Sequence, residues 1–391
     1  MKDNPSGTVV LLLPTLPHYR KDFVEKLIGT FQKQGQSLCL MYGTNRLKKH
    51  IKCVEIAGCE SVMLESGHRK VFGANIGYQK GLVGGIDRVA PSALVCLFNP
   101  GQVSHVLALL YCLRKKTPFL LWGCAYERIE ANWITRFVRR RIRVFFQHRA
   151  SGHICYGEEL KKELLEKGIV EDRIWVAQNT VNVECISEKV ALTNRTVARE
   201  RCGMKDDETL FLFVGALIPP KNLDALIRAF SDYSQEQPAV KLLIVGDGQE
   251  RLLMETLCNQ LGCERNVKFA GAKYDDELCQ YFVAADVFVM PGTGGLAVNE
   301  AMAYGLPVIA AEGDGTVSDL VEHGTNGYVL PNQCSPNKII KALRWYTEAS
   351  VRGEVVRGKE VQSVILKKAS LSNMVEQFAS AVMETAKWDD K

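Results

Sequence analysis

Three glycines and one glutamate in the stretch 281–309 could together hold a phosphorylated ligand. Gly292, Gly294 and Gly295 follow an apolar run, and Glu300 comes soon after them. Glycines let a backbone turn sharply and come close to a ligand, so that backbone N–H groups can reach an anion. A carboxylate nearby can accept hydrogen bonds from hydroxyl groups. Amides for phosphate and a carboxylate for hydroxyls would suit a sugar nucleotide.

A strand, a turn and a helix must position these residues. The apolar run 287–290 predicts a strand in a parallel sheet that is covered on both faces. We expect a helix over 296–303, whose N-terminus would point free N–H groups and a positive dipole end at the turn. A second strand is expected over 307–310. Taken alone, the pattern also fits an ordinary strand–helix unit, since Gly-rich turns are common there.

Length and composition predict a globular protein of two domains. The chain has 391 residues, of which 47% are hydrophobic and 24% charged. A net charge of +5 is too mild to indicate nucleic acid binding. The 13 cysteines are scattered without metal-ligand spacing, which favours a reducing, cytosolic compartment. No signal peptide is expected, and no segment reaches the roughly 20 apolar residues that cross a bilayer.

Strand and helix patterns alternate in both halves of the chain. The expected strands are 9–13, 38–42, 54–56, 61–64, 93–98, 119–122, 153–156, 174–177, 210–214, 241–245, 267–270 and 328–330. Such alternation predicts doubly wound parallel sheets, which bind ligands beyond the carboxyl ends of their strands. In the first half, these ends carry His18, Tyr19, Arg20, Asn99, Cys124 and Tyr126. The polar segment 187–208 is interpreted as the passage between domains.

A basic and apolar segment lies in the first half. Residues 131–157 contain no acid, but they contain Arg136, Arg139, Arg140, Arg141, Arg143 and Arg149, with aromatic and aliphatic residues between them. On a helix this places a basic face beside an apolar one, which is typical of helices in an anionic membrane interface. A core helix with a solvated basic face is the alternative. RNA binding is less favoured, because no RNA-binding signature accompanies the segment.

Five motifs of the second half occur in an order that is found in a known family. They are VGALIPPKNLDALIRAF, LLIVGDG, VKFAGAKYDDEL, AADVFVMPGTGGLAVNEAMAYGLPVI and DLVEHGTNGYVL. Together they resemble the second domain of GT-B glycosyltransferases, in particular the retaining glycosyltransferase family 4. In the first half, LPHYRKDF, LFNP and LLWG look like members that build bacterial surface polysaccharides.

The resemblance implies an α/β fold with two Rossmann-like, doubly wound parallel-sheet domains that face each other across a cleft. An acceptor-binding domain would span 1–186, with a last helix at about 372–391 packing back on it, and a donor-binding domain would span 205–365. The implied reaction is metal-independent transfer from a UDP- or GDP-sugar to a glycan or lipid-linked acceptor, without a cofactor or nucleic acid. The implied location is cytoplasmic, peripheral on the inner face of the cell membrane.

The resemblance also assigns roles to single residues. Lys221 matches the lysine that binds phosphate, Glu300 matches the glutamate that meets the ribose, and these two with Cys124 are the expected catalytic residues. The expected donor contacts are Gly215, Ala216, Gly246, Asp247, Lys273, Tyr274, Gly292, Thr293, Gly294, Gly295, Leu296 and Glu300. The expected acceptor contacts are His18, Tyr19, Arg20, Asn99 and Tyr126.

Three positions depart from the family pattern. Gly292 replaces a glutamate, Ala216 an arginine, and Cys124 a histidine, and the lost groups normally touch the donor or the reacting centre. The candidates that could replace them are Arg20, Lys273 and Arg128 as cations, and Thr293, Glu312 and Asp314 as sugar contacts. The alternatives are a catalytically degenerate GT-B protein that binds nucleotide sugar or acts as a scaffold, and another GT-B enzyme such as an epimerase or a phosphorylase.

Overall fold

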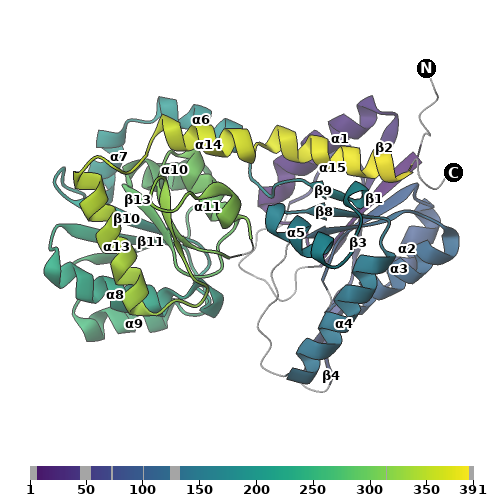
Figure 1. Cartoon of the computed structure of the whole chain (residues 1–391), viewed down its shortest axis with the longest axis horizontal. Helices are drawn as coiled ribbons and strands as arrows, with labels where there is room; N and C mark the ends of the chain where they lie inside the picture. Colours follow the sequence, from purple (N-terminus) through teal and green to yellow (C-terminus); the bar gives the residue numbers. More distant parts are fainter. Residues whose placement is uncertain are drawn as a thin grey trace. The chain divides into compact units, whose positions relative to one another are not determined.

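The computed structural model describes residues 7–44, 54–71, 74–99, 101–123, 133–313 and 315–386. The chain forms two compact units, one of Met1–Gln178 with Ser372–Lys391 and one of Asn179–Leu371. Each unit contains its own parallel sheet with helices around it (Figure 1). The predicted α/β fold with two doubly wound parallel sheets is therefore confirmed.

Unit 1 is built on a seven-stranded sheet with the order β3-β2-β1-β6-β7-β8-β9. Its strands are β1 (Gly7–Leu13), β2 (Gln36–Gly43), β3 (Glu60–Leu64), β6 (Ala93–Leu97), β7 (Phe119–Gly123), β8 (Gly152–Cys155) and β9 (Ile174–Val176). Its helices are α1 (Lys21–Lys33), α2 (Leu82–Val89), α3 (Val103–Lys115), α4 (Trp133–Arg149), α5 (Glu158–Glu166) and α15 (Leu371–Ala386). An antiparallel pair, β4 (Ser66–Val71) and β5 (Ala74–Gln79), was not expected, and residues 54–56 are not a strand.

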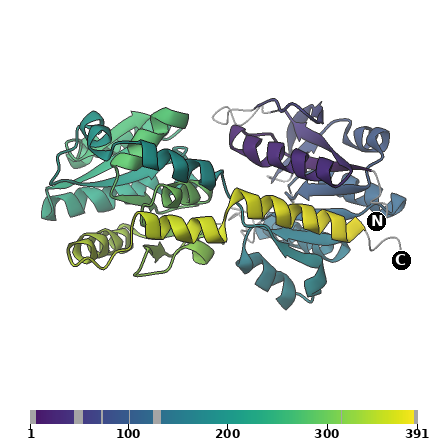
Figure 2. The same cartoon turned by 90° about the horizontal axis from the view of Figure 1, so that it is seen from above.

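Two groups of helices cover the two faces of this sheet. Leu121 belongs to a core cluster with side chains of α2, α3 and α4, whereas the ring of its neighbour Trp122 contacts Phe23 of α1 and Phe378 of α15. Because successive residues of a strand point to opposite faces, α1 and α15 cover one face and α2 to α4 the other. Figures 1 and 2 show the last helix, in yellow, beside the first, in purple. The Nζ of Lys26 also donates to the Ser372 hydroxyl (2.6 Å).

Unit 2 is built on a six-stranded sheet with the order β12-β11-β10-β13-β14-β15. Its strands are β10 (Thr209–Val214), β11 (Val240–Val245), β12 (Val267–Gly271), β13 (Val287–Met290), β14 (Val308–Ala311) and β15 (Gly327–Leu330). Its helices are α6 (Val183–Leu192), α7 (Arg195–Cys202), α8 (Leu223–Glu236), α9 (Arg251–Leu261), α10 (Asp275–Ala284), α11 (Leu296–Ala303), α12 (Val317–Leu320), α13 (Pro336–Val351) and α14 (Lys359–Lys368).

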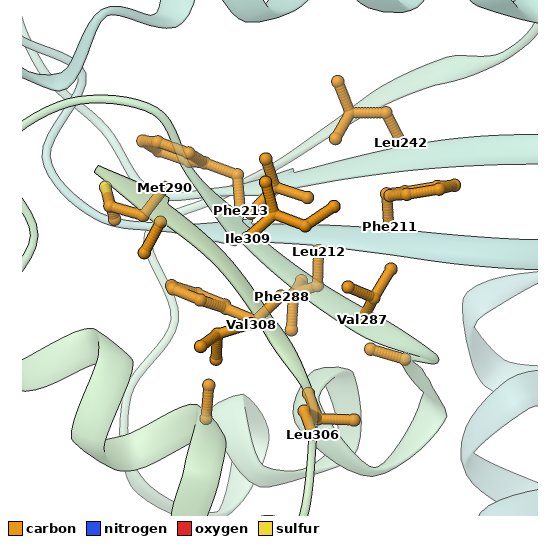
Figure 3. Close-up of a cluster of buried hydrophobic side chains, with 14 of the residues drawn as sticks. Phe211, Leu212, Phe213, Leu242, Val287, Phe288, Met290, Leu306, Val308 and Ile309 are labelled. Atoms are coloured by element: carbon orange, nitrogen blue, oxygen red, sulfur yellow. The ribbon is translucent and has the colours of Figure 1, made fainter. Parts of the chain in front are cut away.

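The centre of this sheet holds the core of unit 2. Phe211 and Phe213 of β10, Phe288 of β13 and Ile309 of β14 are fully buried (Figure 3). Helices on both sides keep water from these strands, which explains why they read as uninterrupted apolar runs. The ends of β10 and β13 are therefore held rigidly side by side.

The interpretation of 187–208 as a passage between domains is wrong. The chain enters unit 2 at Asn179, earlier than the predicted 205, and the polar segment forms most of α6 and α7. Asn182 and Asn194 cap these helices, accepting hydrogen bonds from the N–H groups of Cys185 and Val197. Asparagine is a favoured N-cap, so this signal was present in the sequence. The segment is polar because its helices lie on the surface of the unit.

Candidate functional site

The predicted turn lies where the strand order of unit 2 reverses. β10 pairs in parallel with β11 on one side and with β13 on the other, so that the connections leave the sheet in opposite directions. In doubly wound sheets, ligands bind beyond the carboxyl ends of the strands at such a point. The loops that begin there are 215–222 after β10 and 291–295 after β13.

Hydrogen bonds join these two loops. The Thr293 N–H donates to the Pro220 carbonyl (2.8 Å), and the Nζ of Lys221 donates to the Thr293 carbonyl (2.6 Å). The Asn222 side chain donates to the carbonyls of Pro291 (3.4 Å) and Cys334 (3.0 Å). Sequence reasoning missed Asn222. It has φ 56°, a conformation that asparagine adopts more readily than most residues and that lets it start α8.

The glycines of the site fall into two kinds. A Cβ at Gly292 would lie 2.3 Å from the Pro220 carbonyl oxygen, and one at Gly246 would lie 1.9 Å from that of Gly215. Gly295 has φ 116°, which side chains rarely allow. A Cβ at Gly215, by contrast, would meet nothing closer than 3.5 Å. Gly292 thus departs from the family pattern at a position where this backbone leaves no room for a side chain.

The helix after the turn presents unsatisfied donors to it. α11 begins at Leu296, and its N-cap, Gly295, has no side chain to accept a hydrogen bond. The first N–H groups of a helix have no acceptor within the helix, and its dipole adds positive character there. Lys221 lies beside this helix start through its bond to Thr293. The arrangement can hold an anion such as a diphosphate.

Glu300 lies one turn into the same helix and is partly exposed. Burial raises the pKa of its carboxyl to about 7, and the negative charge of Asp275 adds to the rise. Within the described part of the chain, no donor pairs with this carboxylate. A carboxylate that has a raised pKa and no paired donor is a candidate for ligand binding. It could accept hydrogen bonds from two hydroxyl groups of a bound sugar.

The remaining predicted donor contacts lie along the same edge of the sheet. Asp247 accepts from the Gly248 N–H (2.7 Å) and pairs with Arg251, while Lys273 pairs with Glu277. Tyr274 is 45% exposed at the start of α10, so its ring is accessible to a ligand. Thus Asp247 and Lys273 already have partners in the protein, in contrast to Glu300.

The other candidates in unit 2 differ in exposure. Ala216 and Gly294 are partly exposed, whereas Glu312 is exposed and accepts from the Asn332 side chain (3.4 Å). Asp314, the other proposed sugar contact, lies outside the described residues.

Unit 1 brings Arg20 into an aromatic cluster. The guanidinium lies 4.7 Å from the centre of the Trp122 ring, and its Nη2 donates to the Tyr156 hydroxyl (3.3 Å). Arg20 is 5% exposed, whereas Tyr19 next to it is 40% exposed. A ligand can therefore reach Tyr19 but not Arg20 without a rearrangement, which makes Arg20 a weak substitute for the missing cation. Sequence reasoning missed the partners Trp122 and Tyr156.

The other predicted acceptor contacts lie near the ends of β1 and β6. His18 begins a short 3₁₀ turn, and the backbone N–H of Asn99 donates to Nδ1 of His105 (3.3 Å). Burial lowers the pKa of His105 to about 4, so its ring is neutral. Cys124, Tyr126 and Arg128 lie outside the described residues.

Comparison with known proteins relates the second half of the chain to glycosyltransferases. Residues 194–354 match the family described as "Glycosyl transferases group 1". An uncharacterized glycosyltransferase of Methanocaldococcus jannaschii is 34% identical over 183 residues, which are 46% of this chain and 46% of that protein. The alpha-monoglucosyldiacylglycerol synthase of Streptococcus pneumoniae is 27% identical over 214 residues, 54% of this chain and 45% of that protein. These matches span less than half of each relative.

Solved structures resemble the chain over nearly its whole length. The Anabaena protein HepE, in complex with UDP, has a TM-score of 0.72 at 17% identity, covering 95% of this chain and 98% of its own. At such low identity the likeness concerns the fold alone. The chain therefore has the GT-B fold, and residues 194–354 of its second unit are similar to the group 1 glycosyl transferases.

Proposed function

We propose that the protein is a retaining glycosyltransferase of family 4, which moves a sugar from a nucleotide-sugar donor to a glycan or lipid-linked acceptor in polysaccharide or cell-envelope biosynthesis. One observation carries the proposal. At the switch point of unit 2, Lys221 and the open start of α11 lie together, and that helix carries Glu300, whose carboxylate has no donor among the described residues. The family match and the UDP and UDP-glucose complexes of the Anabaena protein support a nucleotide-sugar donor.

In the proposed reaction, the acceptor hydroxyl attacks the anomeric carbon on the side of the leaving diphosphate. The bond from this carbon to the diphosphate oxygen breaks while the new glycosidic bond forms, and the acceptor proton passes to the leaving oxygen. No protein base is then required. Lys221 and the N–H groups of α11 offset the charge that develops on the diphosphate, which is the main electrostatic demand. With these donors we propose that no metal takes part.

We further propose that unit 1 binds the acceptor and that the protein works at the cytoplasmic face of a membrane. No helix in the described ranges has both the length and the hydropathy to span a bilayer. The support is α4, where Arg136, Arg140 and Arg141 are exposed along a helix without an acid. Each basic residue near an anionic lipid surface adds roughly 1 kcal/mol of attraction.

Thermal shift with UDP, GDP, ADP and CMP tests the donor site. A nucleotide at about 100 times its dissociation constant adds roughly 2.7 kcal/mol of stability. We expect one nucleotide, first of all UDP, to raise the melting temperature of the wild type but not of Lys221→Ala or Glu300→Ala. Lys268→Ala, which removes an exposed lysine of β12, is the matched control and should respond as the wild type does.

Donor hydrolysis or transfer then tests catalysis. We expect Lys221→Ala to lower turnover about 100-fold or more, because it removes a charge at the leaving group. Nucleotide binding without any turnover would favour the degenerate, sugar-nucleotide-binding alternative. No shift with any nucleotide would contradict the donor site itself.

A further inference from the structure

Helix α3 exposes a row of apolar side chains that the proposed function leaves without a role. Val103, Leu107, Leu110 and Leu113 are 45%, 48%, 49% and 41% exposed. Their spacing of three or four residues places them on one side of the helix. Single exposed leucines are common on protein surfaces, but a contiguous row marks an interaction site.

Helix α4, which covers the same face of the sheet, also exposes apolar side chains. Phe137, Val138 and Phe145 are 54%, 48% and 43% exposed. α3 and α4 cover the same face of the sheet, since Leu109 and Phe146 belong to one core cluster, and Figure 1 shows both helices on this side of unit 1. Their exposed sides therefore face away from the sheet together. We call these seven side chains the α3–α4 surface: Val103, Leu107, Leu110, Leu113, Phe137, Val138 and Phe145.

The charges on the two helices of the α3–α4 surface are all positive, and Asp87 of α2 pairs with Lys115 at the end of α3 (3.3 Å). Neither α3 nor α4 contains an acidic residue. The exposed arginines of α4 lie against its aromatic rings: the Arg141 guanidinium is 5.1 Å from the centre of the Phe137 ring, and that of Arg149 is 5.7 Å from that of Phe145. Rings and cations side by side suit the boundary between acyl chains and headgroups, where the ring enters and the cation meets phosphate.

These features select one kind of partner. A second copy docked on this surface would bring the arginines of two α4 helices together, with no carboxylate on either helix to offset them. A nucleic acid would satisfy the arginines but leave the leucines of α3 in water. We infer that the α3–α4 surface enters the interface of an anionic lipid bilayer. The arginines of α4 provide the attraction, and the leucines of α3 provide the insertion.

This inference rests on the proposed function, because it places unit 1 where a lipid-linked acceptor would lie. It adds that the two helices contribute to membrane binding in different ways. Attraction by arginines weakens with salt, whereas insertion of leucines does not. The two contributions can therefore be separated by measuring binding at low and high salt.

Co-sedimentation with vesicles of phosphatidylcholine, with and without phosphatidylglycerol, tests the inference. We expect the full chain to bind only the mixed vesicles. Arg140→Gln/Arg141→Gln should weaken binding at low salt by about fivefold per arginine. Leu107→Gln/Leu110→Gln should weaken it by about tenfold or more at both salt concentrations, since glutamine keeps the helix but not the apolar surface.

A matched pair in unit 2 controls for the loss of exposed leucines. Leu252 and Leu253 on α9 are 76% and 61% exposed. The variant Leu252→Gln/Leu253→Gln should bind vesicles as the wild type does. If Leu107→Gln/Leu110→Gln and Leu252→Gln/Leu253→Gln lost vesicle binding equally, the inference would be overturned. Such a result would show a general effect of surface hydrophobicity.

Two further outcomes would also overturn it. One is unchanged vesicle binding of Leu107→Gln/Leu110→Gln at both salt concentrations. The other is a wild-type dimer in sedimentation equilibrium that becomes a monomer in this variant, since the surface would then join two copies.

Nucleotide thermal shifts, recorded without lipid on the same variants, separate this inference from the proposed function. Vesicle binding without any nucleotide shift would contradict the donor site alone, and a normal shift without vesicle binding would contradict the membrane surface alone.

Discussion

Two glycines of the proposed donor site, Gly292 and Gly215, should respond differently to an added methyl group. A Cβ at Gly292 would overlap the Pro220 carbonyl, so Gly292→Ala should destabilise unit 2 by about 1–3 kcal/mol. Gly215→Ala meets only ordinary contacts and should leave the melting temperature nearly unchanged. Thermal unfolding without ligand checks both.

The same pair tests the position of the diphosphate. If the diphosphate passes close to the backbone at Gly215, Gly215→Ala should weaken nucleotide binding although it leaves stability intact. An unchanged nucleotide affinity would indicate that the diphosphate does not lie close to this loop. Gly292→Glu, which restores the family residue, should destabilise the protein rather than repair it, because the backbone around Pro220 leaves no path for the side chain.

Glu300 should make stability depend on pH. Its folded pKa of about 7 exceeds the ordinary 4.5, so the folded protein favours the neutral carboxyl. The stability this provides is complete below the ordinary pKa and is lost as the pH rises through about 7. Glu300→Gln stays neutral at every pH. It should therefore melt a few degrees above the wild type at pH 8, and at the same temperature as the wild type at pH 4.

Glu300 should also make nucleotide affinity depend on pH. An ionised carboxylate accepts hydrogen bonds from two ribose hydroxyls, whereas a neutral carboxyl must keep one oxygen as a donor. Affinity of the wild type should thus rise between pH 6 and pH 8, and that of Glu300→Gln should stay low and flat. Calorimetric titration across this range measures both, and parallel curves for the two proteins would contradict a role for Glu300.

The sequence predicted which residues form the proposed donor site but not their environment. Lys221, Glu300 and the glycines were predicted because their types and spacing suit phosphate and hydroxyl binding. The loss of glutamate at 292 was also visible, but its reason was not, because it depends on the approach of two loops that lie 72 residues apart (Thr293 to Lys221). Neither could the sequence show that Arg20 is buried beneath aromatic rings.

At the scale of elements, α7 is held to the sheet by one carboxylate that is only partly exposed. Asp286 pairs with Arg195 (2.6 Å) and Arg199 (3.1 Å), and also accepts from the Leu210 N–H (2.8 Å). Arg199 is 7% exposed and donates hydrogen bonds to the backbone carbonyls of Lys205, Glu208 and Ala284. This network fixes the start of β10 and therefore the strand that leads to the donor site.

Removal of this carboxylate should be costly. Asp286→Asn leaves the buried Arg199 without a counter-charge and should destabilise unit 2 by about 3–5 kcal/mol. Asp224→Asn breaks the pair with Arg228, whose side chains are 54% and 48% exposed, and should cost less than about 0.5 kcal/mol. Urea unfolding compares the two. A similar loss in both would mean that the Asp286 network adds little to stability.

Periodic elements were predictable, and irregular ones were not. The helix expected over 296–303 was found as α11, because apolar spacing and glycines mark both of its ends. The pair β4 and β5 was missed because its sequence is polar and contains glycines instead of alternating apolar residues. The helices α6 and α7 were missed because their polar surfaces resembled a linker, although their asparagine caps were visible.

At the scale of the whole molecule, unit 1 depends on α15. Phe378 of this helix contacts both Phe23 and Trp122, and all three are fully buried. A chain that ends at Leu371 should therefore unfold unit 1 at a lower temperature, whereas unit 2, with its separate core, should keep its transition. Calorimetry with and without nucleotide distinguishes the units, because the nucleotide should raise only the transition of unit 2. A single unchanged transition would contradict this division.

The return of the chain to unit 1 also has a consequence for its biosynthesis. The ribosome must make residues 179–371 after the last strand of unit 1 and before α15. At roughly 5–20 residues per second, this takes on the order of ten to forty seconds, during which the site of Phe378 on unit 1 stays open to solvent. Unit 2 can close its core first. Nascent unit 1 thus spends this time with an aromatic surface exposed, and it is the part of the chain that chaperones would meet.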